Sequence, residues 1–146
     1  MNAAMTITMR PVRATDAEQV ASLLTELGYP STAASVKDRL DRALQSETSR
    51  CLVAQDADEV IGLMSAELIP YFPTGMTVCR VTSLVVASQH RRRGIGDMLI
   101  SAATEFARKH RCSGIEVTSA ESRVEAHRFY ERIGFSRTAF RFFRAL

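Results

Sequence analysis

Apolar residues recur with two different periods along the chain, which predicts a mixture of strands and helices. Over Thr6–Val12 apolar and polar residues alternate, as they do in a strand with one buried face. The residues Thr15–Glu18 match a helix-capping box, and apolar residues then follow at helical spacing as far as Gly28. The same spacing predicts a second helix over about Thr32–Gln45. The chain is therefore expected to open with one strand and two helices.

The rest of the chain alternates between the two patterns. Pro70 to Gly75 is rich in turn-forming residues and predicts a loop, and Gly134 lies where a left-handed helix cap is expected. The element order is β-αα-βββ-α-β-α-β, which indicates a mixed α/β fold in a single domain over residues 1–146. The further predicted strands are Cys51–Gln55, Val60–Leu68, Val78–Ala87, Gly114–Ser119 and Phe135–Phe143, and the further helices are Gly94 to about His110 and Ser122–Ile133.

Composition limits the class of protein. A chain of 146 residues with 46% hydrophobic and 24% charged residues is typical of one globular domain. No uncharged apolar run approaches the roughly 20 residues that cross a bilayer, and no signal peptide is expected. The three cysteines Cys51, Cys79 and Cys112 are odd in number and widely spaced, which argues against a disulfide framework and against a metal site. We expect a cytoplasmic protein that does not act on a membrane.

Charge is distributed unevenly between the two halves. Residues 1–73 carry six Lys/Arg against ten Asp/Glu, a net −4, whereas residues 74–146 carry thirteen against six, a net +7. The basic half favours an anionic partner, and the cluster Arg91–Arg93 suits a compact polyphosphate. A nucleic-acid-binding module is an alternative. It is disfavoured because Phe129, Phe135, Phe140 and Phe142 fall at the spacing of core residues.

The segment from Thr82 to Asp97 carries the strongest chemical signal. A strand that is apolar on both faces ends, a basic turn with two glycines follows, and an amphipathic helix begins. The first turn of a helix offers unpaired N–H groups that favour phosphate, and Gly94 and Gly96 have no side chains to block its approach. A flexible turn beside a solvated basic surface is the alternative interpretation. The motif is neither a P-loop nor the dinucleotide fingerprint.

Two motifs together resemble the GCN5-related N-acetyltransferase superfamily, whose members use acetyl-coenzyme A. The first is Arg91-x-x-Gly94-x-Gly96 after the strand residues Leu84–Val86. The second is Ala126-x-x-Phe129-Tyr130-x-x-x-Gly134-Phe135. The element order is similar from Thr6 to Phe143. The resemblance implies a mostly antiparallel central sheet of six to seven strands, with a splayed pair of central strands and about four flanking helices.

The resemblance also implies a cofactor site. Backbone amides from Arg92 through Asp97 would hold the pyrophosphate, and the central strand would pair with the pantetheine arm. Arg123 stands where relatives often have an asparagine that contacts pantetheine, so Arg123 or Arg132 is expected to reach a phosphate instead. The implied cofactor-binding residues are Leu84, Val85, Val86, Arg91, Arg92, Arg93, Gly94, Ile95, Gly96, Asp97, Arg123 and Phe129.

Tyr130 matches the family's tyrosine that protonates the leaving thiolate. A phenol with a reference pKa near 10 is a reasonable donor to a thiolate whose conjugate acid has a pKa of about 8–9. A core role is the alternative, because Tyr130 also belongs to an apolar helical stripe. Many relatives carry a glutamate beside the central-strand leucine, but this chain has Thr82 and Ser83 there. Glu67 is then the best candidate for the general base, acting through water, unless it is simply a solvated charge. Glu121 and His127 are weaker candidates.

The acceptor is expected to be a primary amine of a small molecule or a peptide. Tyr71 and Phe72, on the loop predicted at Pro70–Gly75, are candidate acceptor contacts, although they could equally fold into the core. The resemblance implies direct transfer from acetyl-CoA within a ternary complex. A non-catalytic CoA-binding sensor of the same fold is the alternative function. The apolar predicted strand Phe135–Phe143 could pair with a second copy to form a homodimer.

Overall fold

One twisted sheet organises the chain in the computed structural model, which describes residues 6–146. Residues 6–146 of the predicted single domain are described. The sheet has five strands in the order β1-β2-β3-β4-β5, all antiparallel except the last pair. The elements are β1 (Ile7–Pro11), α1 (Ala17–Leu27), α2 (Ala33–Gln45), β2 (Ser49–Asp56), β3 (Glu59–Tyr71), β4 (Met76–Val86), α3 (Ile95–Lys109), β5 (Gly114–Val117) and α4 (Val124–Arg132).

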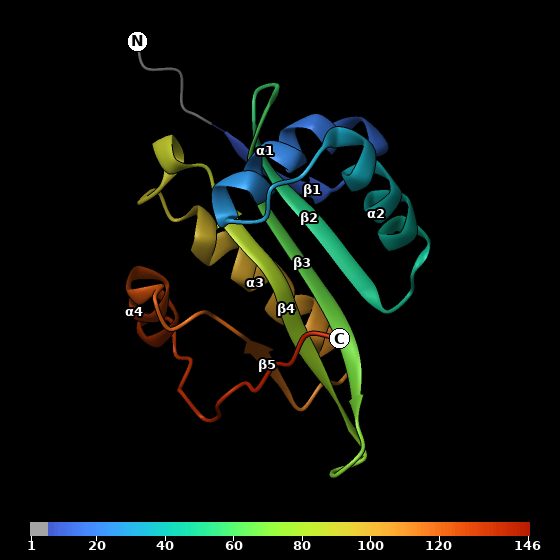
Figure 1. Cartoon of the computed structure of the whole chain (residues 1–146), viewed down its shortest axis with the longest axis vertical. Helices are drawn as coiled ribbons and strands as arrows, with labels where there is room; N and C mark the ends of the chain where they lie inside the picture. The colour runs from blue at the N-terminus through green and yellow to red at the C-terminus, as the bar shows by residue number, and fades with distance from the viewer. Residues whose placement is uncertain (1–5) are drawn as a thin grey trace.

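The helices form layers on both faces of the sheet (Figure 1). β3 supplies both layers, since Val60 and Leu63 join the cluster of α1 and α2 while Ile61 and Met64 join the cluster of α3. A bulge at Ile61 shifts the alternation between Val60 and Leu63. The aromatic residues of α4 pack against the α3 side. The mixed α/β fold and the four helices were predicted, and the α1, α2, α3 and α4 ranges agree with the periodicity to within a few residues.

The predicted closing strand at Phe135–Phe143 is wrong, and so is the count of six to seven strands. Phe140 and Phe142, expected in the core, are 84% and 93% exposed. Polar residues interrupt both alternating sets of positions, because Arg137 and Arg141 lie between Phe135 and Phe143, whereas Ser136 and Thr138 precede Phe140 and Phe142. Neither face is apolar enough to fix the segment on this domain, whereas Phe135 still packs against the α3 cluster.

The β3–β4 hairpin is longer than the sequence pattern predicts. Pairing continues to Tyr71 and Met76, so the loop expected over Pro70–Gly75 shrinks to a turn. Tyr71 is half exposed and Phe72 is 97% exposed, which makes the core alternative for these two residues wrong. The hairpin projects beyond the helices that cover the sheet (Figure 1). No helix is there to bury its tip.

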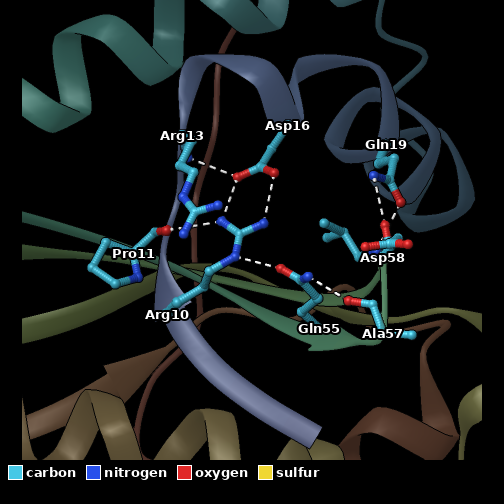
Figure 2. A network of polar contacts seen from close by, with 9 residues as sticks. Arg10, Pro11, Arg13, Asp16, Gln19, Gln55, Ala57 and Asp58 are labelled. Atoms are coloured by element: carbon cyan, nitrogen blue, oxygen red, sulfur yellow. Dashed lines mark hydrogen bonds and ion pairs between the residues drawn. The ribbon is translucent and has the colours of Figure 1, made fainter.

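A buried ion pair fixes the start of α1. Asp16, 4% exposed, accepts two hydrogen bonds of 2.8 Å from the Arg10 guanidinium and one of 2.7 Å from the Arg13 N–H (Figure 2). Arg10 also donates to the side chain of Gln55 on β2. The capping box predicted at Thr15–Glu18 is therefore wrong in position. A short 3₁₀ turn precedes α1, and the side chain that accepts from the capping N–H, on the backbone of Arg13, is that of Asp16.

A second side chain ties α1 to the β2–β3 turn. Gln19 donates to the Asp58 carbonyl at 3.5 Å and accepts from the Val60 N–H at 2.8 Å (Figure 2). Such a side-chain amide replaces the backbone partner that a strand end lacks. The N-terminal half of α1 is thus held on the sheet by polar contacts as well as by apolar packing.

We expect Asp16→Asn to lower the free energy of unfolding by about 3 kcal/mol, because it leaves the Arg10 guanidinium buried without a counter-charge. The hydrogen bonds from Arg10 hold the pKa of the Asp16 carboxyl below its ordinary value of 3.8. Stabilisation by this carboxylate is therefore fully present above about pH 4 and is lost as the pH falls through the lower pKa of the folded state. Denaturant unfolding of the wild type and of Asp16→Asn from pH 7 to pH 2.5 measures the difference in the free energy of unfolding.

Asp41→Asn is the matched control, since it breaks the exposed Lys37–Asp41 pair of 3.0 Å by the same change of residue. We expect no measurable loss of stability from it. A wild-type advantage over Asp16→Asn that stays constant down to pH 2.5 would contradict the role of the ion pair.

Candidate active site

β4 is longer than its neighbour β5 and extends beyond it. They pair in parallel only from Val78 with Gly114 to Val81 with Val117. β4 then continues to Val86, paired with β3 on its other side. The predicted residues Leu84, Val85 and Val86 therefore lie in the part of β4 that has no β5 partner. On that side of β4 these residues have no strand partner within residues 6–146, although the Val86 carbonyl accepts a hydrogen bond from Arg91.

The basic turn leads directly into α3. Gly94 is the N-cap residue with a φ of 77°, a left-handed conformation that glycine adopts without strain, and open space surrounds the position of its missing Cβ. Gly94 supplies no capping side chain, so the first N–H groups of α3 keep their capacity for an anion. Ile95 is 1% exposed, and its side chain anchors this turn in the core.

The arginines of the turn are held by neighbouring elements. Arg91 donates to the Val86 carbonyl at 3.0 Å and lies 3.9 Å from the carboxylate of Glu26 on α1. Arg93 contacts the His90 ring at 2.7 Å and lies 3.7 Å from the carboxylate of Asp56. Arg92 is exposed. The turn is thus fixed on three sides while its arginines stay near the first turn of α3.

Gly96 has a packing role that the motif did not indicate. A Cβ built on Gly96 would lie 3.1 Å from the Phe129 ring of α4. Arg132 stacks over the same ring, with 5.5 Å from its guanidinium carbon to the ring centroid, and lies 3.4 Å from the carboxylate of Asp97. The absence of a side chain at Gly96 therefore lets α4 pack closely against the first turn of α3.

Tyr130 is placed by this packing. Its ring makes edge-to-face contacts with Phe129 at 5.3 Å and with Phe135 at 5.6 Å. Burial raises the pKa of the Tyr130 phenol above its ordinary value of 10, and the positive charge of Arg123 opposes that rise. The phenol is therefore protonated at neutral pH. It is available as a proton donor.

Arg123 lies at the start of α4 and contacts the other helical layer. Its guanidinium donates a hydrogen bond to the Leu27 carbonyl at the end of α1 and lies against Gly28. His127, a weaker candidate for a base, contacts the Ala120 carbonyl at 2.9 Å and so supports the turn before α4. Glu121 is exposed.

Glu67 lies on the side of the sheet that α1 and α2 cover. The carboxylate accepts a hydrogen bond from Ser49, and Glu67 is paired across the strands with Arg80. The Arg80 guanidinium itself binds Glu116 at 2.6 Å. Near Glu67 the hydroxyls of Ser65 and Thr82 are hydrogen-bonded at 2.7 Å. A polar patch therefore stands where many relatives are expected to carry a strand glutamate.

Sequence patterns gave no signal for Ser119. It follows the last paired residue of β5 by two positions, and its hydroxyl is buried without a hydrogen-bond partner among residues 6–146. A buried hydroxyl without a partner, just beyond the end of β5, is a group to which a ligand could hydrogen-bond. Only the place where strand pairing ends could have drawn attention to this residue.

A hollow of about 500 Å³ lies elsewhere, between β1, β2 and the C-terminal half of α3. Its lining includes Met9, Arg50, Phe106 and His110 but none of the predicted site residues. Within residues 6–146, no His, Cys, Asp and Glu cluster suits a metal ion, and no helix is long and apolar enough to cross a bilayer. The predicted Tyr71 and Phe72 lie at the exposed tip of the β3–β4 hairpin.

The three cysteines are unpaired with one another. Burial raises the pKa of Cys51 to about 12 and that of Cys79 to about 11, and it also raises the pKa of Cys112. These thiols are therefore protonated at neutral pH and are poor nucleophiles.

This site geometry, together with sequence similarity, defines the class of protein. Residues 17–135 match the model of the acetyltransferase (GNAT) family, and the chain belongs to that family. Solved structures share the fold. An aminoglycoside N-acetyltransferase AAC(6')-Iy in complex with CoA superposes with a TM-score of 0.88 at 17% identity, over 100% of this chain and 98% of that one. A transcriptional regulator from Bacillus halodurans C-125 gives 0.88 at 23% identity, over 97% and 100%.

Curated relatives match over part of their length. Aminoalkylphosphonate N-acetyltransferase from Salmonella typhimurium is 33% identical over 88 residues, which are 60% of this chain and 57% of the relative. Human N-acetyltransferase 8 is 27% identical over 105 residues, 71% of this chain and 46% of the relative. The match therefore covers about half the length of these two relatives.

We expect Gly96→Ala to lower the free energy of unfolding by about 1 kcal/mol, because the new methyl group displaces a Phe129 ring that Tyr130 and Arg132 hold in place. In a Phe129→Leu background the same substitution should stabilise, since alanine favours a helix by about 1 kcal/mol over glycine. Denaturant unfolding of the four variants of this cycle measures the coupling. An equal effect of Gly96→Ala in both backgrounds would contradict the close packing.

Proposed function

We propose that this protein is an acetyl-CoA-dependent N-acetyltransferase that transfers an acetyl group to a primary amine by direct attack in a ternary complex. The observation that carries the proposal is the stretch of β4 beyond the end of β5, which leads to the uncapped first turn of α3, with the Tyr130 phenol packed between α4 and the sheet. An aminoglycoside N-acetyltransferase with this fold was solved with CoA bound, and several relatives are named N-acetyltransferases.

The residues present suit a long anionic cofactor with an amide-bearing arm. The open space at Gly94 and the N–H groups of Ile95, Gly96 and Asp97 suit the pyrophosphate. Arg91, Arg92 and Arg93 stand beside them, and Phe129 supports this turn from α4. The unpaired edge at Leu84, Val85 and Val86 suits the pantetheine arm, which the buried Ser119 hydroxyl could also meet. Arg123 contacts α1, and this contact favours binding of the acceptor by Arg123 over binding of the cofactor.

One side chain of this protein donates a proton in the reaction, and another receives one. Bound acetyl-CoA would supply a thioester whose carbon–sulfur bond breaks as the acceptor nitrogen bonds to the carbonyl carbon. Tyr130 donates its phenolic proton to the departing sulfur. Glu67 receives the proton of the acceptor amine through water, and its position on the α1 side of the sheet supports this role. Tyr71 and Phe72 offer an apolar surface to the rest of the acceptor.

The acceptor is a small molecule or a peptide with a primary amine. The aminoalkylphosphonate N-acetyltransferase of Salmonella typhimurium is named for a small amine, which supports the first of these. The three protonated, unpaired thiols support a cytoplasmic location.

Calorimetry and an acetyl-transfer assay test the proposal. We expect CoA to bind the wild-type protein and at least one amine of a broad panel to release CoA from acetyl-CoA. Tyr130→Phe should leave CoA affinity within about twofold and lower kcat by about 100-fold, because general acid catalysis is typically worth that much. Tyr29→Phe, which removes a hydroxyl from a 64% exposed tyrosine, is the control and should match the wild type.

The outcomes separate the alternatives. Binding of CoA without turnover of any amine would favour a non-catalytic CoA-binding module. No binding of CoA by folded protein would contradict the cofactor site itself. An unchanged kcat in Tyr130→Phe would remove Tyr130 from the proton transfer.

We also propose a homodimer built on residues 136–146. This segment forms no strand, and Phe140, Phe142 and Phe143 are 84%, 93% and 78% exposed. The outer edge of β5 has no neighbouring strand in the described sheet. A second copy offers the same two features, so each copy can add its segment to the free edge of the other.

Light scattering coupled to gel filtration should give the mass of two chains for the wild type. A Phe140→Ser and Phe142→Ser double variant should give the mass of one chain, because it removes the apolar contacts but keeps the length of the segment. Phe72→Ser, at an equally exposed phenylalanine, is the control and should remain a dimer. A wild-type mass of one chain would contradict the dimer.

A further inference from the structure

Arg123 joins helices that lie on opposite faces of the sheet. α1 packs with one cluster of core residues, whereas the aromatic residues of α4 pack with the other cluster across the sheet. The Arg123 guanidinium nevertheless donates to the Leu27 carbonyl at the end of α1. The sheet is continuous as far as Val81 and Val117, where β4 and β5 stop pairing. Arg123, six residues beyond the end of β5 in the chain, therefore links the two layers.

The charge of Arg123 is not balanced by a carboxylate. Three other arginines near the site each face one: Arg91 lies 3.9 Å from Glu26, Arg93 lies 3.7 Å from Asp56, and Arg132 lies 3.4 Å from Asp97. No carboxylate among residues 6–146 forms an ion pair with Arg123. Its contact with Leu27 uses one of five N–H donors, and the side chain is only partly exposed. A partly buried cation with unused donors suits an anion.

The groups near Arg123 and on the α1 side of the sheet suggest which ligand supplies this anion. Burial raises the pKa of Tyr130 and the charge of Arg123 lowers it, so the guanidinium lies within electrostatic reach of the phenol. On the α1 side the sheet presents Glu67, while Arg80 is already paired with Glu116. The α1 side of the sheet thus carries a carboxylate that suits an amine, and the end of α1 carries a guanidinium that suits an acid group.

We propose that Arg123 is a specificity-determining residue that binds an anionic group, a carboxylate or a phosphonate, on the amine acceptor. The proposal rests on the N-acetyltransferase function and adds a substrate class to it. The planar guanidinium can hold both oxygens of such a group in a bidentate contact. Its hydrogen bond to α1 fixes the orientation of the side chain before the acceptor arrives. The acceptor amine would then be held at a set distance from its own acid group.

Matched acceptor pairs test this substrate class. β-Alanine is compared with β-alaninamide, and 2-aminoethylphosphonate with its neutral diethyl ester, through kcat/KM for release of CoA from acetyl-CoA. We expect the wild type to prefer the anionic member of a pair by about 10-fold or more, the worth of one hydrogen bond to a charged group. Arg123→Gln should bring this preference near unity and change the neutral member far less. Intrinsic differences between the two amines cancel when one ratio is compared across variants.

Two further variants make the test specific. Arg128→Gln makes the same change at an exposed position of α4 and should keep the wild-type preference. Arg123→Lys keeps the charge without the bidentate geometry and should give an intermediate preference. It also serves if Arg123→Gln does not fold.

The possible results distinguish this proposal from the one on which it rests. An anionic-to-neutral ratio that is the same in the wild type and Arg123→Gln would assign Arg123 a purely structural role and overturn the inference. Equal use of both members by the wild type would overturn it as well, with the acetyltransferase function intact. Turnover of no amine by a protein that binds CoA would overturn both.

Discussion

The site depends on the unequal pairing of a single strand. β4 is hydrogen-bonded to β3 along its whole length but to β5 over four residue pairs only. The first partnership supports the whole strand, with a bulge at Thr82, and the second ends at Val81, just before this bulge. Because β4 leads directly into the basic turn, the same strand also fixes the position of the first turn of α3. An open edge and an anion site thus share one support.

Close contacts between helices then determine where the chemical groups stand. The missing side chain at Gly96 brings Phe129, and with it Tyr130, against α3, while Arg123 ties α4 to the end of α1. The start of α1 is held independently by Asp16 and Gln19. Arg123 is thus a direct contact between the end of α1 and the layer that carries the phenol.

Local sequence patterns predicted the helices, most of the strands and the basic turn, because periodicity and capping act within a few neighbouring residues. The strand predicted over Phe135–Phe143 is absent, because a composition typical of strands does not show whether the edge of a neighbouring strand is available for pairing. The capping residue was misplaced since Asp16 is selected by Arg10 on β1, a contact that local pattern does not encode. Motif spacing indicated Tyr130 and Gly94, whereas the contact of Arg123 with Leu27 and the unpaired Ser119 depend on where the pairing of two distant strands ends.

The protonated thiols have a consequence for a protein proposed to handle an activated acyl group. Thioesters exchange readily with thiolates, so an ionised cysteine could become acylated in place of the intended amine. Burial raises the pKa of Cys79 to about 11 and that of Cys51 to about 12, so both thiols are protonated at pH 7. A protonated thiol is a poor nucleophile towards a thioester, and the core can therefore hold cysteine beside an activated acyl group.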